Sequence, residues 1–512
     1  MYMTIMLLRS LAACTRPLGH MKTSDLDNHK YLIKEGMQYV KSITFLLVLF
    51  SINCAIAQTR SEPYKFEVEI KKEIEAEKFE ILVPENRSDS QSRMISLSFI
   101  KLESRAVKPG SPIIYLAGGP GGSGTSAMKG QRWIMFDRLR DIADVIILDQ
   151  RGTGLSSPLP RCQASRSIPA DSATSRQNVL RWHEEAAKEC LDYWKKEGID
   201  LKGYTTWESA GDIEAVRKAL EVDQVSLLGI SYGTHLALAT LKRYPESIDR
   251  LVLASAEGLD QTVKLPSRTD AYFDRLQAVI NADPEAKARF PDIKKLIRGV
   301  LDSVESNPIY MQVDDDPEFY HTLGKFEIQR ITSYMIADPA YVPSLLNGYL
   351  EASKGSFNWF KNYLDWYIRD NSISFNGMAL AMDLASGVSD ERLKQVNKEA
   401  ETALLGDATN FPMPHLRGVI DGIDLGDDFR DSFKSDRPIL FISGTLDGRT
   451  YPEAHKDLAQ KFTNSEILTI ENAGHNLFFS HEELIESIGD FFEGGSFEIH
   501  DLKAPLPNFS SN

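Results

Sequence analysis

Long hydrophobic runs are nearly absent from this sequence, and the longest covers only residues 43–50 (ITFLLVLF). That run is too short for a membrane-spanning helix, which needs ~20 apolar residues. Lys41 precedes it, and the small residues of Ala55-Ile56-Ala57 follow, which is the pattern of a secretory signal peptide. We therefore expect residues 1–57 to be a leader, with a mature chain from near Gln58 and no stable membrane span after cleavage.

The segment before this run is long for a leader, and it contains Met21 and Met37. Translation could begin at Met1, Met21 or Met37, and a start at Met37 would give a leader of ordinary length. A lipoprotein attached through Cys54 is the alternative, although Asn53 occupies a position where a lipobox requires a small residue. The sequence therefore predicts a secreted or periplasmic protein.

Cysteine is also scarce, with four in 512 residues, and Cys14 and Cys54 lie in the expected leader. Cys162 and Cys190 remain. In an oxidising compartment such a pair favours a disulfide, and two buried free thiols are the alternative. Because no cluster of cysteine and histidine is present, we expect no metal site.

Basic residues are outnumbered, with 58 Lys and Arg against 73 Asp and Glu, a formal charge of −15. No Lys/Arg stripe of the kind that binds a phosphate backbone is present, so nucleic acid is not an expected partner. Hydrophobic residues make up 42% of the chain and charged residues 26%, which is ordinary for a globular protein with a well-buried core.

The hydrophobic pattern predicts an α/β fold. Three stretches between Lys65 and Leu102 alternate polar and apolar residues, as antiparallel strands with one solvated face do. Short continuous apolar runs follow, separated by helical stretches, which is typical of parallel strands covered by helices. These runs begin at Pro112, Val145, Val225, Arg250, Pro438 and Glu466.

A helical insertion interrupts this alternation. After Ser255 the apolar residues recur at i, i+3, i+4 and i+7 until the strands resume near Pro438. We expect the insertion to form a cap over the carboxyl edge of the sheet, where open α/β sheets bind ligands. The predicted division is a core over 58–257 and 436–495, a cap over 258–435 and a C-terminal extension over 496–512.

Gly229-Ile230-Ser231-Tyr232-Gly233 directly follows the strand that begins at Val225 and precedes a helix. In that context G-x-S-x-G forms a nucleophile elbow, a turn too tight for side chains on either flank. We therefore expect Ser231 to be a nucleophile.

A serine hydroxyl needs a base within hydrogen-bond reach and a third group that orients the base. Asp447 follows the strand that begins at Pro438, and His475 follows the next strand, so both should reach the carboxyl edge beside Ser231. The pattern predicts His475 as the base and Asp447 as the orienting acid. His235, His455 and His481 lie in helical stretches and follow no strand.

A glycine-rich loop, PIIYLAGGPGGSG, begins with the strand at Pro112. Such a loop exposes backbone N–H groups, and acyl transfer requires two of them near the developing oxyanion. We expect one from Tyr232 and the other from Gly119 or Gly121. A phosphate-binding loop is the alternative, but no Gly-Lys-Ser/Thr follows.

Together, the motifs GGPGGSG, DQRGTGLS, GISYGT, SGTLDGRTYP and AGH resemble the prolyl aminopeptidase family of serine peptidases and its exported tripeptidyl aminopeptidase-like branch. The resemblance runs from about residue 112 to 480. It implies an α/β-hydrolase fold, a mostly parallel sheet with a large helical cap, no cofactor, and release of residues from the free N-terminus of a peptide. Asp149 and Arg151, within DQRG, are expected to brace loops.

An aminopeptidase must hold the substrate ammonium group, and a carboxylate in a partly dehydrated pocket does this well. Glu257, just after the strand that begins at Arg250, is the candidate. Alternatively it caps a helix or braces the insertion, or its strand end carries the triad acid. If Glu257 fails as the anchor, the carboxylate is expected among the cap helices.

Three functions fit the sequence. The first is an aminopeptidase that forms an acyl-enzyme on Ser231 and releases proline, dipeptides or tripeptides. The second is an esterase or another small-molecule hydrolase on the same scaffold, with a small ester or amide substrate. The third is a binding protein without catalysis, which the presence of Ser231, Asp447 and His475 argues against.

Overall fold

The computed structural model describes residues 59–69, 72–313, 319–367, 371–495 and 502–510. The expected leader, with its signal peptide, Met37 and Cys54, lies outside these residues, as does part of the expected C-terminal extension. In the described part of the chain, no helix has both the length and the apolar character needed to cross a bilayer.

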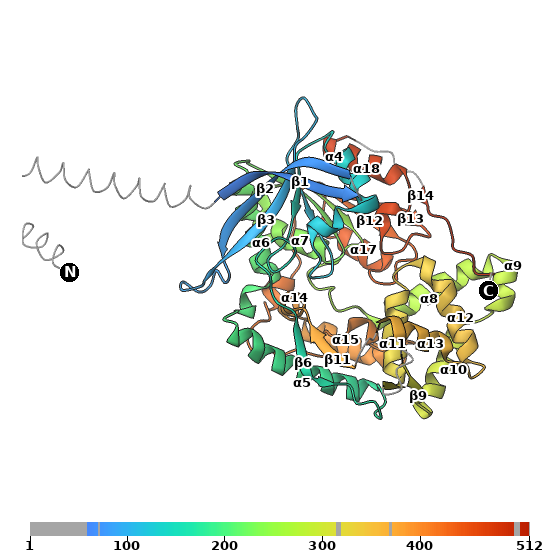
Figure 1. Cartoon of the computed structure of the whole chain (residues 1–512). Helices are drawn as coiled ribbons and strands as arrows, with labels where there is room; N and C mark the ends of the chain where they lie inside the picture. The colour runs from blue at the N-terminus through green and yellow to red at the C-terminus, as the bar shows by residue number, and fades with distance from the viewer. Residues whose placement is uncertain (1–58, 70–71, 314–318, 368–370, 496–501, 511–512) are drawn as a thin grey trace, which may run out of the picture. The chain divides into compact units, whose positions relative to one another are not determined.

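A ten-stranded sheet forms the core, in the order β1-β2-β3-β5-β4-β7-β8-β12-β13-β14 (Figure 1). From β5 to β14 neighbouring strands run parallel, whereas β2, β3 and β5 pair antiparallel. The predicted change from antiparallel to parallel strands is confirmed. The strands are Thr59–Glu69 (β1), Lys72–Pro84 (β2), Met94–Leu102 (β3), Ile113–Leu116 (β4), Val145–Leu148 (β5), Val225–Ile230 (β7), Ile248–Ala254 (β8), Ile439–Gly444 (β12), Ser465–Glu471 (β13) and Leu502–Lys503 (β14).

Helices cover both faces of the parallel strands, which explains why those strands read as continuous apolar runs. In β4, Ile114 and Leu116 point to the face covered by α6 and α7, while Ile113 and Tyr115 point to the face covered by α4 and α18. The core helices are Gly124–Ala127 (α3), Trp133–Leu139 (α4), Thr206–Ala219 (α6), Tyr232–Arg243 (α7), Pro452–Ala459 (α17) and Glu483–Glu493 (α18).

The segment between β8 and β12 forms the predicted helical cap, which has a hydrophobic core of its own. The apolar spacing around Leu276 and Ile297 corresponds to buried stripes of α8 and α10. The cap helices are Pro266–Asn281 (α8), Pro284–Arg289 (α9), Ile293–Ser306 (α10), Lys325–Met335 (α11), Val342–Ala352 (α12), Asn358–Tyr367 (α13), Gly377–Ser386 (α14), Asp390–Ala400 (α15) and Asp427–Arg430 (α16). Three short strands, Ile309–Gln312 (β9), Tyr320–Leu323 (β10) and Ser372–Phe375 (β11), accompany them.

The cap also recruits a segment that the sequence assigned to the core over 58–257. Cys162–Ser167 (β6) pairs antiparallel with β11, and Arg176–Lys196 (α5) packs against β6, β11 and α11 (Figure 1). The excursion between β5 and α6 therefore packs with the cap, although the sequence assigned it to the core over 58–257. The partner strand β11 lies some 200 residues downstream, and no local pattern reveals such a pairing.

The last described residues connect sheet and cap. β14 pairs parallel with β13, and beyond it the Phe509 ring is buried in the cap core. Arg289 Nη1 donates to the Ser510 carbonyl at 3.0 Å. This part of the expected extension is thus integrated into both parts of the fold.

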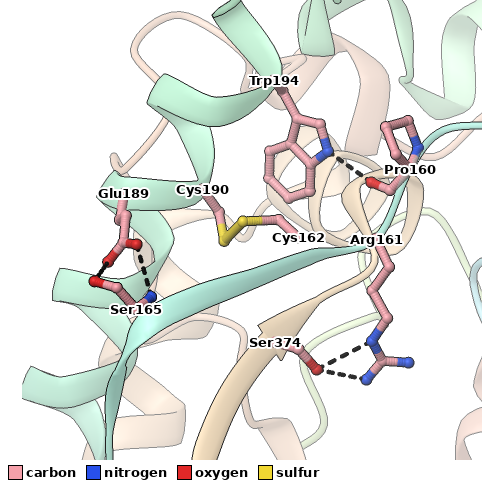
Figure 2. Close-up of a disulfide and its surroundings, with 8 residues drawn as sticks. All are labelled: Pro160, Arg161, Cys162, Ser165, Glu189, Cys190, Trp194 and Ser374. Atoms are coloured by element: carbon pink, nitrogen blue, oxygen red, sulfur yellow. Dashed lines mark hydrogen bonds between the residues drawn. A yellow bond between two sulfur atoms is a disulfide. The ribbon is translucent and has the colours of Figure 1, made fainter. Parts of the chain in front are cut away.

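Cys162 and Cys190 form a disulfide that ties β6 to α5 (Figure 2). Their Cα atoms are 5.7 Å apart, and both side chains are buried. The Trp194 ring, one turn further along α5, donates from Nε1 to the Pro160 carbonyl at 2.8 Å. The crosslink and this hydrogen bond both fix the beginning of β6 against the C-terminal half of α5.

We predict that replacing both cysteines with serine lowers the free energy of unfolding by about 3 kcal/mol, because the crosslink closes a loop of 28 residues. Chemical denaturation of the oxidised protein and the double variant measures this difference. A non-reduced digest should also yield the two cysteine peptides joined. Two free thiols in protein purified under oxidising conditions would contradict the prediction.

Candidate active site

Ser231 occupies the turn between β7 and α7. Its backbone has a φ of 54° and a ψ of −127°, a conformation that costs an L-residue roughly 1–3 kcal/mol. A side chain at Gly229 would collide with the Gly233 carbonyl, and one at Gly233 would collide with the Leu116 carbonyl of β4. The two flanking glycines are therefore required by close backbone contacts, as expected for a nucleophile elbow.

Asp447 lies just past β12 and is fully buried. Its Oδ1 accepts from the backbone N–H groups of Arg449 and Thr450 at 2.7 and 2.9 Å, and its Oδ2 accepts from Thr450 Oγ1 at 2.7 Å. Burial alone would raise the pKa of this carboxyl, but the facing His475 and these hydrogen bonds outweigh it, so the pKa lies well below its usual value. Asp447 is therefore held as a carboxylate.

His475 lies in the loop after β13 and contacts that carboxylate. Its Nδ1 is 2.9 Å from Asp447 Oδ2, which leaves Nε2 as the free ring nitrogen. Its backbone is bound from two sides, because Ser255 Oγ donates to the His475 carbonyl at 2.8 Å and the His475 N–H donates to Ala337 of the cap at 2.8 Å.

The three residues gather at one edge because β7, β8, β12 and β13 are successive parallel neighbours. Among the described residues Ser231 Oγ makes no hydrogen bond to His475. In unliganded sites such a contact is often long and shortens only when substrate binds.

The glycine loop begins beside Ser231. A side chain at Gly118 would approach Ser231 Cβ to 3.0 Å, so this loop and the elbow lie directly together. Gly119 and Gly121 have φ values of 128° and 95°, which few residues other than glycine adopt. In the described structure the N–H groups of Tyr232, Gly119 and Gly121 donate to no protein acceptor.

Asp149 and Arg151 both brace loops. The Asp149 carboxylate accepts from Thr125 N, Thr125 Oγ1 and Leu155 N at 3.0, 2.7 and 2.7 Å, which fixes the segment after the glycine loop. The fully buried Arg151 pairs with Asp212 at 2.6 Å.

Helix α14 of the cap lies across this edge. A side chain at Gly121 would meet Asn376 and Ala379, and Asp383, four residues further on, lies close enough to Glu257 and Lys264 to feel their charges. Asn376, Ala379 and Asp383 follow the i, i+3, i+7 spacing of one helix face. One face of α14 therefore spans the region from the glycine loop to Glu257.

Asp383 is the unusual acid on this face. Its side chain makes no hydrogen bond or ion pair with any described residue, and the residue is partly exposed. Burial raises its pKa to about 7, with the Glu257 charge adding to the effect and Lys264 and Arg449 opposing it. The Asp383 carboxyl thus titrates near neutrality.

Glu257, in contrast, already has a partner. It is buried, and its Oε1 forms an ion pair with Lys264 Nζ. Burial alone would raise the Glu257 pKa, but Lys264 outweighs it and the pKa is lowered. No local pattern predicts this pairing, because Lys264 reaches Glu257 only through the fold of the loop between β8 and α8.

The remaining histidines near the edge serve the core. His235 bonds to the Gly258 carbonyl and Ser386 Oγ at 3.1 and 2.9 Å. His455 bonds to Ser443 Oγ at 2.7 Å, and burial lowers its pKa to about 4. No group of three or more His, Cys, Asp or Glu side chains in the described ranges could hold a metal ion.

Two family models match the chain. Residues 111–304 match the model described as alpha/beta hydrolase fold, and residues 427–503 match the model of TAP-like protein. The first match contains Ser231, and the second contains Asp447 and His475. Both agree with the sheet topology.

Several named proteins are similar to this chain. The putative hydrolase YuaR of Escherichia coli is 25% identical over 412 residues, or 76% of this chain and 78% of that protein. Tripeptidyl aminopeptidase of Streptomyces lividans is 27% identical over 186 residues, or 35% of this chain and 33% of its own. Serine protease Hip1 of Mycobacterium tuberculosis is 28% identical over 184 residues, or 34% of this chain and 35% of that protein. The match thus spans about a third of the two named peptidases.

The topology, the strained serine turn and both family matches lead to one assignment. The chain is an α/β-hydrolase-fold protein, and its match to the TAP-like model and its named peptidase relatives support the prolyl aminopeptidase and tripeptidyl aminopeptidase-like family.

Proposed function

We propose that this protein is an exported serine hydrolase that removes residues from the N-terminus of peptides through an acyl-enzyme on Ser231. The observation that carries the proposal is the hydrogen bond between His475 Nδ1 and the buried Asp447 carboxylate, at the sheet edge that also presents the Ser231 turn. With Nδ1 donating to Asp447, Nε2 is the nitrogen that can accept a proton.

In the proposed reaction Ser231 Oγ attacks the scissile carbonyl and its proton passes to His475 Nε2. Negative charge develops on the carbonyl oxygen. The backbone N–H groups of Tyr232 and of Gly119 or Gly121 donate to no described acceptor, so they can donate hydrogen bonds to this oxygen. The protonated His475 then gives its proton to the leaving amine. Water, deprotonated by the same nitrogen, releases the acyl group and regenerates Ser231.

Export is supported by the disulfide, because such crosslinks persist in oxidising compartments. The peptide substrate is supported by the names of the related tripeptidyl aminopeptidase and serine protease. An esterase is the second candidate, since the same residues would hydrolyse an ester and the more extensively matched relative is named only a putative hydrolase.

For the substrate ammonium group, Asp383 fits better than Glu257. The Glu257 charge is already neutralised by Lys264, so a second cation would have to compete with an existing ion pair. Asp383 has no such partner and lies on the α14 face above the sheet edge. We therefore place the ammonium group at Asp383 and assign Glu257 to positioning Lys264.

Replacing Ser231 with alanine should abolish covalent labelling by a fluorophosphonate and lower kcat by roughly a millionfold, because the attacking atom is removed. Gel fluorescence of the labelled protein measures the first effect. The Ser303→Ala variant is the control, since it removes an exposed hydroxyl of α10 that lies outside the candidate site. Undiminished labelling of Ser231→Ala would show that Ser231 is not the nucleophile.

Replacing Asp383 with asparagine should lower kcat/KM by roughly 30-fold or more for substrates with a free amine, because the charge partner of the ammonium group is lost. N-acetylated and ester substrates should react as before. The assay compares one chromogenic peptide amide with its N-acetylated form.

Glu257→Gln is the matched variant, and it should affect free and acetylated substrates equally. If Glu257→Gln lost activity only on the free-amine substrate, and Asp383→Asn kept its activity, Glu257 would be the residue that binds the ammonium group.

Asp383 also predicts a pH-dependent stability. An unfolded aspartate titrates near pH ~3.9, whereas burial raises the pKa of the folded residue to about 7. Because its pKa is raised in the folded state, Asp383 holds its proton more tightly there than in the unfolded chain. The free energy of unfolding therefore falls as pH rises from about 4 to about 7, where the unfolded chain has already lost this proton. Asp383→Asn should therefore melt near the wild-type temperature at about pH 4 and above it at about pH 8. A constant difference between the two melting curves across this range would contradict the raised pKa.

A further inference from the structure

A chain of buried polar side chains connects helix α14 of the cap with the core helices beneath it. It consists of Thr206 at the start of α6, Tyr232 and His235 of α7, and Ser386 at the end of α14. At most 1% of each of these residues is exposed. An unpaired polar group inside a protein costs free energy, so the hydrogen bonds of these side chains restrict where α14 can lie.

The direction of the hydrogen bonds follows from His235. Its Nδ1 lies 3.1 Å from the Gly258 carbonyl oxygen, and a carbonyl oxygen can only accept. His235 Nδ1 therefore carries a proton, and because burial lowers the pKa of His235, the ring is neutral. The other nitrogen, Nε2, must then accept, and Ser386 Oγ donates to it at 2.9 Å.

The chain continues through Thr206 to Tyr232. Because Ser386 Oγ gives its proton to His235, it accepts from Thr206 Oγ1 at 3.2 Å. Thr206 Oγ1 in turn lies 3.1 Å from the Tyr232 hydroxyl, from which it can accept. The Tyr232 hydroxyl oxygen is also 2.8 Å from Met382 Sδ. Two residues of α14, Met382 and Ser386, are therefore held by side chains of the core.

The two ends of this chain lie beside the candidate site. Tyr232 directly follows Ser231, and Gly258 directly follows Glu257. The middle of the chain holds the turn of α14 that carries Asp383, because the two contacts of that turn with the core lie one residue before and three residues after it. One set of hydrogen bonds thus connects the nucleophile turn, the proposed ammonium anchor and the loop of Glu257.

Arg430 holds the same end of α14 through a different contact. Its Nη1 donates to the Ser386 carbonyl at 3.0 Å and to Asp424 Oδ1 at 2.7 Å. The contact with Ser386 uses the backbone, so it is retained when the Ser386 side chain is shortened. A Ser386→Ala variant should therefore keep the helix and lose the hydrogen bonds that join it to α6 and α7.

We propose that His235 and Ser386 are positioning residues that hold Asp383 at a fixed separation from the nucleophile. The proposal rests on the proposed peptidase function and deepens it. An enzyme that binds a free N-terminus must hold the ammonium group and the scissile carbonyl at the same time, and a small displacement of either contact weakens the complex. An N-acetylated substrate has no ammonium group, so its reaction should not depend on this chain.

Replacing Ser386 with alanine should raise KM for a free-amine peptide amide about tenfold, the scale of one weakened charge-assisted hydrogen bond. The kcat for this substrate should stay near the wild-type value, because the ammonium contact is made equally in the ground state and the transition state. For the N-acetylated form of the same peptide, both constants should be unchanged. Steady-state assays on the two substrates measure the difference.

Ser209→Ala is the matched control. Ser209 is a buried serine of α6, and its hydroxyl makes no hydrogen bond with the described residues. Its removal should change the constants of neither substrate. Melting curves of both variants show whether the fold is kept. An equal loss on the free and the N-acetylated substrate in a folded Ser386→Ala protein would overturn the proposal.

A double variant tests whether Ser386 acts through Asp383. In the Asp383→Asn background, Ser386→Ala should add nothing to the loss on the free-amine substrate, because the contact that Ser386 positions is already gone. Two residues that act independently would instead multiply their separate losses. That result would also overturn the proposal.

Hydrogen exchange separates failure of this proposal from failure of the proposed function. Ser386→Ala should speed amide exchange in α14 about tenfold and leave exchange in β7 unchanged. Unchanged exchange in α14 would overturn the proposal for any substrate. If the proposed function fails instead, the wild type will show no preference for free-amine over N-acetylated peptides, and the exchange rates will still decide whether this chain holds α14.

Discussion

The tight turn at Ser231 is the constraint on which the rest of the candidate site depends. It holds a non-glycine residue at positive φ, and it brings α7 so close to β4 that Gly233 has no room for a side chain beside the Leu116 carbonyl. The same closeness requires glycine at position 118 and starts the glycine loop next to the serine. The free N–H groups and the hydroxyl are thus placed together by backbone packing. Core burial on both faces of the sheet compensates for the local strain.

The cap is joined to the site by backbone contacts as well as by helix packing. The loop that carries His475 donates to Ala337, and side chains at Gly448 and Gly474 would collide with Ile336 and Pro339 of the cap. The loops that carry Asp447 and His475 therefore pack against the same short segment, residues 336–339. The cap and the sheet edge form one site, and one hydrophobic cluster contains buried residues of both, such as Leu227 of β7 and Met378 of α14.

Local signals explain which features the sequence could predict. Strand ends, flanking glycines and helical spacing are all encoded within a few residues, so the sheet, the cap helices and the gathering of Ser231, Asp447 and His475 at one edge could be anticipated. The remaining features depend on contacts between distant segments. The pairing of β6 with β11 moved an expected core segment into the cap, Lys264 neutralised Glu257, and Asp383 became a candidate only once α14 was placed across the edge. Ser255 was missed because a serine at a strand end carries no signal until its hydrogen bond to the His475 carbonyl is known.

The two-sided attachment of His475 has a consequence for how the molecule tolerates motion. The His475 carbonyl accepts a hydrogen bond from Ser255 at the end of β8, and the His475 N–H donates one to Ala337 of the cap. The position of the imidazole ring therefore depends on both the sheet and the cap. A rotation of the cap would displace this ring before it disturbed any strand pairing. For the proposed activity of His475, we therefore expect heat resistance to depend on this cap contact as well as on the ten-stranded sheet.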